Sequence, residues 1–152
     1  MLDERFEKMR KDVSILLVED DQDHVELALR AMEKYGVANQ IHVARDGAEA
    51  LDYLLGGRLE TLPEVVLLDL NLPKISGLDV LRKIRENENT RLLPVVILTS
   101  SDEETDLARS YELGVNSYIR KPVSFAEFAQ AIREVGVYWL VLNQSPPKRR
   151  ID

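Results

Sequence analysis

Short apolar runs alternate along this chain with longer stretches in which apolar residues recur every three or four positions. The short runs have the length of buried strands, and the longer stretches have the periodicity of amphipathic helices. This alternation is typical of a parallel sheet covered by helices on both faces. The pattern predicts five β-α units of an α/β fold, with strands near residues 15–18, 41–44, 65–68, 95–98 and 117–120.

The first predicted helix has a clear beginning and a clear end. Asp21 suits its N-cap and Gly36 suits its C-cap. Its expected buried positions, at three- and four-residue spacing, are Val25, Ala28, Leu29 and Met32.

The other predicted helices carry similar signals. Asp46 with Glu49, and Ser124 with Glu127, have the spacing of capping boxes. Gly114 suits the end of a helix over residues 103–113, and a further helix passes through residues 78–84.

Length and composition predict one domain with short flanking segments. The chain has 152 residues, no internal repeat and no evident linker, so we expect a domain over residues 13–143 between segments 1–12 and 144–152. Cysteine is absent, which excludes disulfides and thiolate metal sites. No apolar stretch approaches the roughly 20 residues that span a bilayer. We therefore expect a cytoplasmic protein without a membrane partner.

The charge balance argues against nucleic acid as a partner. The net charge is -7, whereas proteins that bind nucleic acid usually present basic surfaces. The basic residues 148–150 near the C-terminus fit a solvated terminus better than a binding patch.

Polar residues follow four of the predicted strands at the points where they end. Asp69 comes directly after one strand, and Glu19, Asp20 and Asp21 follow another; the remaining two strands lead to Thr99 and to Lys121. In open parallel sheets, ligands bind beyond the carboxyl ends of the strands. We expect these acids, the hydroxyl and the ammonium to meet at one edge of the sheet.

Clustered carboxylates favour a hard cation over a phosphate or a dinucleotide. A phosphate site would need a glycine-rich turn, but the first turn contains Glu19, Asp20 and Asp21. Together with Asp69, these oxygens suit Mg²⁺. Repulsion among the acids should raise the pKa of at least one of them, and metal binding should stabilise the fold.

A carboxylate beside Mg²⁺ can attack phosphorus and form an aspartyl phosphate. Asp69 is the candidate nucleophile. Lys121 offers an ammonium and Thr99 offers a hydroxyl to the remaining phosphoryl oxygens.

Three other polar residues receive ordinary structural interpretations. Asp21 is expected to be a helix cap only. His24 and His42 lack a partner histidine or cysteine at ligand spacing, which favours solvated or hydrogen-bonded side chains over metal ligands.

This constellation resembles the receiver domain of two-component response regulators, from Ser14 to about Asn143. The resemblance implies a doubly wound, flavodoxin-like sheet with strand order 2-1-3-4-5. It also implies that Asp69 is the phosphoacceptor, that Asp20 binds Mg²⁺ directly with Glu19 as its acidic companion, and that Asn71 adds its main-chain carbonyl.

The resemblance further implies a switch and a partner. Thr99 and Lys121 complete the catalytic set, and Tyr118 takes the place of the aromatic residue that turns inward when the hydroxyl residue moves toward the phosphoryl group. Tyr118 also fits an ordinary strand aromatic. The bond between Lys121 and Pro122 is expected to be cis. The phosphoryl donor would be a sensor histidine kinase.

Three alternatives use similar parts. A phosphatase of the haloacid dehalogenase class needs a second aspartate two residues after the first, where this chain has Asn71. A flavodoxin-type module would not carry Glu19, Asp20 and Asp21 in its first loop. A degenerate receiver that acts only as a docking module usually lacks one of the acidic, hydroxyl or lysine positions, all of which are present here.

The last predicted helix suggests how a signal leaves the domain. Residues 135–142 are apolar almost all round, so this helix needs burial on more than one side. Trp139 fits the protein's own core, whereas Tyr138 and Val141 suit a homodimer contact, unless the tail folds back on its own sheet. Residues 69–77 and 138–147 also resemble regulators paired with phytochrome histidine kinases, which tend to dimerise.

Overall fold

Five parallel strands form a single sheet in the order β2-β1-β3-β4-β5 in the computed structural model of this chain. This topology confirms the predicted doubly wound α/β fold. The strands are β1 (Ser14–Val18), β2 (Gln40–Ala44), β3 (Val65–Leu68), β4 (Val95–Thr99) and β5 (Ser117–Arg120). The helices are α2 (Gln22–Tyr35), α3 (Gly47–Leu55), α4 (Gly77–Glu86), α5 (Glu104–Glu112) and α6 (Phe125–Val137).

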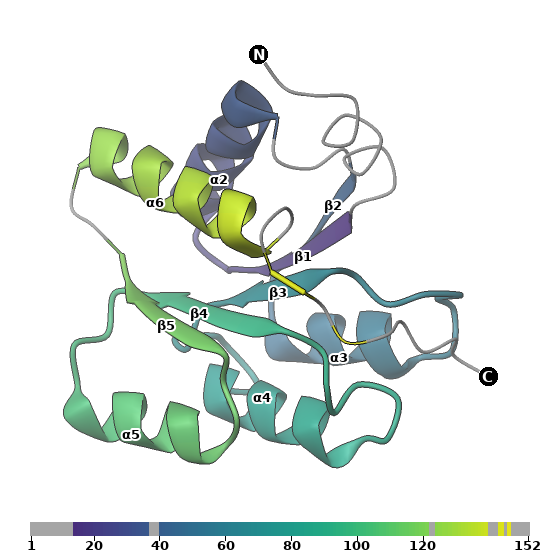
Figure 1. The fold of residues 1–152 in the computed structure, drawn as a ribbon. Helices are drawn as coiled ribbons and strands as arrows, with labels where there is room; N and C mark the ends of the chain where they lie inside the picture. The colour runs from purple at the N-terminus through teal and green to yellow at the C-terminus, as the bar shows by residue number, and fades with distance from the viewer. Residues whose placement is uncertain (1–13, 37–39, 122–123, 140–142, 145, 147–152) are drawn as a thin grey trace.

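The helices cover the sheet in two layers. Figure 1 shows α2 and α6 together on one face and α3, α4 and α5 on the other. The structure describes residues 14–36, 40–121, 124–139, 143–144 and 146. Within these ranges, no helix is long and apolar enough to cross a membrane.

Alternate residues of the central strands build two separate cores. In β1, Ile15 and Leu17 pack with α2 and α6, whereas Leu16 and Val18 pack with α3 and α4. Side chains alternate between the faces of a strand, and here both faces are covered. For this reason the strands read as continuous apolar runs without polar alternation, which is what made them visible in the sequence.

The caps that bound α2 form as predicted. The Asp21 side chain accepts hydrogen bonds from the backbone N–H groups of Asp23 (2.9 Å) and His24 (3.3 Å). Gly36 ends the helix in the left-handed region, with φ of 60°. The buried stripe differs in one position from the prediction, because Ala31 is buried and Leu29 is only partly buried. Since α2 packs against α6 as well as the sheet, its buried face is displaced around the helix.

The predicted N-cap of α6 is also confirmed, and so are some of the predictions for its C-terminal end. The Ser124 hydroxyl accepts a hydrogen bond from the Glu127 backbone N–H (3.2 Å). Trp139 packs against the core beneath α2 and α6, as predicted, and Tyr138 is exposed. Val141, proposed for a dimer contact, and Pro122, proposed for a cis bond, lie outside the described residues.

Backbone hydrogen bonds continue one residue beyond three of the strands. The N–H groups of Glu19 and Asp69 donate to Ala44 O and Val18 O, each at 3.0 Å. The Lys121 N–H donates to Thr99 O at 2.7 Å. Each of these polar residues is therefore held by the sheet itself at its carboxyl edge, although none belongs to a strand.

Candidate functional site

Asp69 lies at the centre of a hydrogen-bonded cluster on the carboxyl edge of the sheet. Its carboxylate is buried, and its Oδ1 accepts from the Thr99 hydroxyl (2.8 Å) and the Asn71 backbone N–H (3.1 Å). Its Oδ2 accepts from Lys121 Nζ at 3.0 Å. Burial raises the pKa of Asp69, but the Lys121 ammonium and the bonds from Thr99 and Asn71 outweigh it and lower the pKa below its ordinary value. The carboxylate is therefore held as an anion.

Glu19 shares the same lysine but is held differently. Its buried side chain contacts Lys121 Nζ through Oε1, and its Oε2 accepts from the Asp21 backbone N–H at 3.2 Å. The pKa of Glu19 is raised to about 7, chiefly by burial and further by the Asp69 charge, although the Lys121 ammonium partly offsets the rise. Repulsion between the acids predicts such a rise from the sequence, but burial is the larger cause.

The acids have the chemistry of a site for a hard cation. One carboxylate oxygen from each of Glu19, Asp20 and Asp69 lies within 4.8 Å of the others. Glu19 and Asp69 are buried and Asp20 is exposed, so the group is open to solvent on one side. Clustered carboxylate oxygens fit Mg²⁺, which binds few protein ligands and retains waters. Asn71 contacts Asp69 through its N–H, and a role for its carbonyl stays a prediction.

A chain of hydrogen bonds leads from Asp69 to Tyr118. The Thr99 hydroxyl donates to Asp69 and accepts from the Ser101 N–H at 3.3 Å. The Tyr118 hydroxyl donates to Ser101 O at 3.2 Å, and Ser101 Oγ donates to Asp106 in the first turn of α5 at 2.6 Å. Tyr118 is partly buried against the core beneath α3 and α4. The loop after β4 thus joins the site to α5 and β5.

Sequence reasoning missed the place of His24 at this site. Its Nδ1 lies 2.9 Å from Lys121 Nζ and 3.6 Å from Glu19 Oε1. One signal was available, because a helix that follows β1 begins at the carboxyl edge of the sheet. His24 is in the first turn of that helix, so its side chain could have been expected near the strand ends.

Gly77 lets α4 begin directly against the loop that carries Asp69. A Cβ atom at this position would lie 2.4 Å from Asp69 O and 2.5 Å from Leu70 Cα, both backbone atoms. The Gly77 N–H donates to Leu70 O at 3.0 Å. The absence of a side chain at Gly77 is therefore what allows this close approach.

Residues 15–133 match the family described as response regulator receiver domain. The match covers far more than half of the 152 residues. The chain belongs to this family. The family predicted from the strand-end residues is therefore confirmed.

Two curated relatives resemble this receiver over most of their length. The probable methanogenesis regulatory protein FilR2 of Methanothrix harundinacea is 48% identical over 136 residues, 87% of this chain and 86% of FilR2. Response regulator Rcp1 of a Synechocystis strain is 36% identical over 129 residues, 83% of this chain and 88% of Rcp1.

Solved structures of receivers share the fold. The phosphorylated cyanobacterial phytochrome response regulator RcpA is 34% identical with a TM-score of 0.82, over 88% of this chain and 98% of that one. The Mn²⁺-bound form of Rcp1 is 33% identical with a TM-score of 0.80, over 88% and 99%. The bacteriophytochrome response regulator AtBRR is 52% identical with a TM-score of 0.67, over 87% and 98%.

These similarities support several broad statements. The receiver resembles regulators of phytochrome-associated systems, as the sequence suggested. A receiver domain implies a histidine kinase partner and a divalent metal site. The structure brings Glu19, Asp20, Asp69, Thr99 and Lys121 together, while the role of each in phosphoryl transfer stays a prediction.

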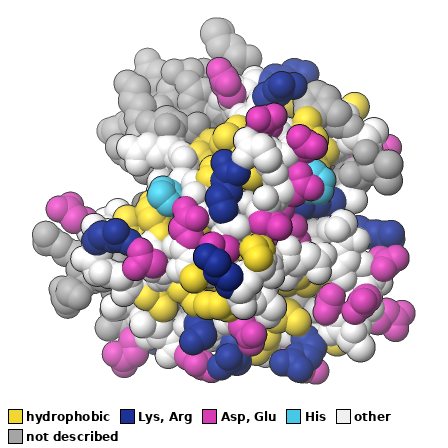
Figure 2. All heavy atoms as spheres, turned by 180° about the vertical axis from the view of Figure 1, so that it is seen from behind, with side chains coloured by type: hydrophobic (Ala, Val, Ile, Leu, Met, Phe, Trp, Pro, Cys, Tyr) yellow, Lys and Arg dark blue, Asp and Glu magenta, His cyan; other side chains and the backbone are white. Residues whose placement is uncertain are grey.

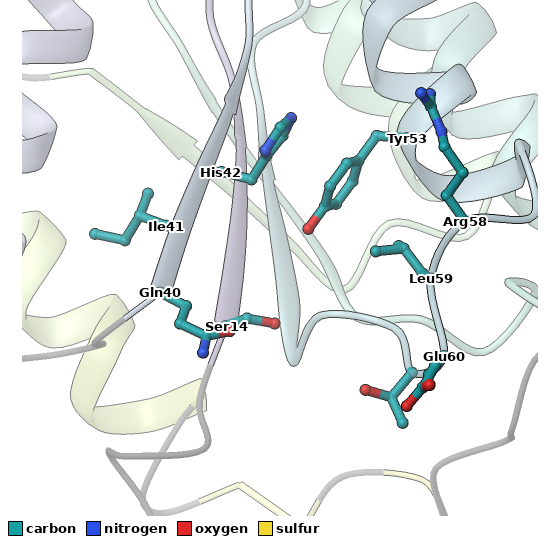
Figure 3. Close-up of a pocket in the computed structure, with 9 residues that line it drawn as sticks. Ser14, Gln40, Ile41, His42, Tyr53, Arg58, Leu59 and Glu60 are labelled. Atoms are coloured by element: carbon teal, nitrogen blue, oxygen red, sulfur yellow. The ribbon is translucent and has the colours of Figure 1, made fainter.

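A pocket of about 570 Å³ lies at the opposite edge of the receiver's sheet, near the amino ends of β1 and β2. Figure 3 shows His42, Tyr53 and Arg58 around it. The His42 ring stacks on Tyr53 with 3.9 Å between ring centroids and 9° between planes. His42 thus has an aromatic partner on the surface, and it lies within β2 rather than at the strand ends that carry the acids.

Proposed function

We propose that this receiver accepts a phosphoryl group from a sensor histidine kinase on Asp69 and passes the signal on by a change of conformation. One observation carries the proposal. The Asp69 carboxylate is held as an anion by Thr99, Asn71 and Lys121, beside two further carboxylates that suit a divalent cation. The candidate nucleophile, the candidate donors for phosphoryl oxygens and the candidate cation ligands therefore lie within one small cluster.

The metal we propose for this cluster is Mg²⁺. Glu19, Asp20 and Asp69 would hold it through carboxylate oxygens, with Asn71 contributing its main-chain carbonyl. When bound, Mg²⁺ neutralises charge on the phosphoryl oxygens and so makes attack by an anionic carboxylate possible.

In the transfer, the Asp69 carboxylate forms a bond to phosphorus while the phosphorus–nitrogen bond of the kinase phosphohistidine breaks. The leaving imidazole takes up the electron pair of that bond and a proton from solvent. Lys121 and Thr99, which already donate to Asp69, are positioned to donate to the new phosphoryl oxygens. Their preorganisation reduces the reorganisation needed at the moment of transfer.

We classify the chain as a phosphoacceptor signalling protein rather than an enzyme with an external substrate. It assists its own phosphorylation and a slow hydrolysis of the aspartyl phosphate. The position two residues after Asp69 is Asn71, whose amide cannot act as the acid and base that rapid phosphatase turnover requires.

Thr99 and Tyr118 would form the switch. The bonds from Asp69 through Thr99 and Ser101 to the Tyr118 hydroxyl form a continuous path between the proposed phosphorylation site and β5. A nearly complete shift from 1:99 to 99:1 requires about 5.5 kcal/mol of differential stabilisation. Recruitment of Thr99 by the phosphoryl group would weaken the Ser101 contact and free the Tyr118 ring to turn.

The output we propose is a homodimer that forms through the end of α6. Tyr138 is 49% exposed, and its ring meets the Trp139 ring edge-on at 5.1 Å between centroids. An exposed tyrosine supported by a core tryptophan is a suitable anchor for a second chain. We assign the receiver to residues 13–143, with segments 1–12 and 144–152 as flanks.

We infer that the kinase is a phytochrome, since the similar protein RcpA is a phytochrome response regulator and AtBRR is a bacteriophytochrome response regulator. Transfer of radiolabel from ATP through a purified phytochrome kinase to this chain tests the inference. Absence of transfer from phytochrome kinases, with transfer from another kinase class, would assign a different stimulus.

The surroundings we propose are cytoplasmic, without nucleic acid or membrane as a partner. On the face shown in Figure 2, acidic side chains lie among the Lys and Arg side chains. The chain as a whole carries a net charge of -7. Such a surface opposes the accumulation of a polyanion.

Light scattering in Mg²⁺, with and without beryllofluoride as a phosphoryl mimic, tests the site and the output together. We expect the solution mass to double with the mimic in the wild-type protein and to stay constant in Asp69→Asn. A solution mass that does not change when the mimic is added would mean that the signal passes through a different partner.

A further inference from the structure

The ammonium of Lys121 has three acceptors within the described part of the chain, one for each of its N–H groups. They are Glu19 Oε1, Asp69 Oδ2 at 3.0 Å and His24 Nδ1 at 2.9 Å. The lysine side chain is buried, so each N–H needs a partner from the protein. His24 completes this set, although sequence reasoning gave it no role.

The direction of the contact follows from chemistry. A lysine ammonium donates hydrogen bonds and accepts none, so His24 Nδ1 must present its lone pair to Lys121. The imidazole proton is then on Nε2. His24 is held in place by its backbone bond to the Asp21 cap and by stacking on Phe128, with 6.4 Å between ring centroids.

The three acceptors differ in what phosphorylation would do to them. Asp69 would carry the phosphoryl group, and Glu19 would be engaged by the cation. Only His24 Nδ1 keeps its lone pair free for Lys121 throughout. If one N–H stays on His24, the ammonium pivots about a fixed point as its other bonds pass to the phosphoryl oxygens.

We propose that His24 is a positioning residue that holds the Lys121 ammonium beside Asp69 during phosphoryl transfer; the proposal rests on the function proposed above. It acts through Lys121 and has no contact of its own with the transferred group. A residue of this kind accelerates transfer because the lysine ammonium is already oriented before the reaction.

The rival explanation is packing, since the same ring stacks on Phe128. Two substitutions separate the explanations. His24→Asn loses the ring but keeps an acceptor, because its Oδ1 takes the place of Nδ1 on Cγ. His24→Phe keeps an aromatic ring for Phe128 but removes the acceptor.

The experiment measures the rate at which phosphoramidate, a donor too small to depend on a kinase interface, labels each variant in Mg²⁺. We expect His24→Phe to be about tenfold slower than wild type, the effect of one lost hydrogen bond to a charged group. We expect His24→Asn to remain within about twofold of wild type, as rescue by a matched acceptor requires. The other histidine provides the control: His42→Phe should not change the rate.

The possible outcomes are distinct. Equal rates for wild type and His24→Phe, or a His24→Asn rate as low as that of His24→Phe, would overturn the positioning role while leaving Asp69 as the acceptor. A wild-type protein that takes no label at all would instead overturn the proposed function.

Nitrogen NMR of the imidazoles tests the contact without any reaction. We expect His24 in metal-free protein at neutral pH as the Nε2–H tautomer, with a Nδ1 resonance that shifts in Lys121→Ala. A proton on Nδ1, or a Nδ1 resonance that does not shift in Lys121→Ala, would rule out the contact itself.

Discussion

The two edges of the sheet hold similar residues in different states. At the carboxyl edge, Asp69 and Lys121 form an ion pair whose side chains are 7% and 5% exposed. At the amino edge, Asp52 and Arg58 also pair, but their side chains are 66% and 69% exposed. Each edge has a histidine nearby as well. The two groups thus differ in burial and in sharing: the carboxylates at the carboxyl edge are buried and share Lys121, whereas the Asp52–Arg58 pair is exposed.

The physical reason is solvent screening. An exposed pair gains little, because water competes for both ions and holding two long side chains costs entropy. A buried pair is screened far less, so each group depends on the others. The pKa of Asp69 is lowered and the pKa of Glu19 is raised, and both carboxylates contact the ammonium of Lys121.

The largest contrast is expected between two identical substitutions. Asp69→Asn should abolish labelling by phosphoramidate, because the amide is not a nucleophile for phosphorus. Asp52→Asn, at the opposite edge, should label at the wild-type rate. Gel analysis of both variants checks this, and a labelled Asp69→Asn protein would assign the phosphoryl group elsewhere.

The next contrast concerns the cations. Lys121→Ala in the metal-free protein at pH 8 should lower the free energy of unfolding by about 3 kcal/mol, because two buried carboxylates lose their common partner. Arg58→Ala should lower it by less than about 1 kcal/mol. Urea unfolding in the presence of a chelator measures both. Similar losses in the two variants would show that burial does not distinguish the edges.

The fold could be predicted from the sequence because its strongest signals are local. The apolar runs of β1, β3 and β4 are buried on both faces, and polar residues end them abruptly. Parallel strands bring such ends together, so Asp69, Thr99 and Lys121 were expected at one edge without knowledge of any contact.

The details that escaped prediction depend on packing between elements. The contact of His24 with Lys121 joins residues 97 positions apart, and it depends on how α2 lies over the sheet. The burial of Ala31 in place of Leu29 in α2 likewise depends on α6. Helical periodicity defines a face, but a neighbouring helix decides how wide that face is.

Two glycines extend the comparison to the backbone. Gly77→Ala at the carboxyl edge should lower the free energy of unfolding by about 2 kcal/mol, because the new methyl group overlaps backbone atoms that cannot move aside. Gly57→Ala near the amino edge meets no atom within 4 Å but has φ of 80°, so its cost should be about 1 kcal/mol. Thermal unfolding of both variants gives the order, and a reversed order would contradict the packing argument.

The last contrast concerns pH in the metal-free protein. The pKa of Glu19 is raised from 4.5 to about 7 in the folded state, so the folded protein binds this proton more tightly than the unfolded chain. Stability from Glu19 is therefore fully present below about 4.5 and should fall by about 1 to 2 kcal/mol as pH rises through about 7, after allowance for screening. Asp69 acts in the opposite sense and in a lower window, because its folded pKa lies below 3.8.

Added Mg²⁺ should reverse the trend, because a cation among the acids replaces the proton on Glu19. The stabilisation by Mg²⁺ should thus increase from pH 5 to pH 8, and calorimetry should detect proton release on binding. Glu19→Gln should remove both the pH trend between about 4.5 and 7 and the proton release. Glu60→Gln, at the amino edge, should leave both unchanged, since Glu60 lies outside the carboxylate group formed by Glu19, Asp20 and Asp69. A pH trend that persists in Glu19→Gln would mean that another group titrates in this range. The electrostatic distinction between the two edges would then fail.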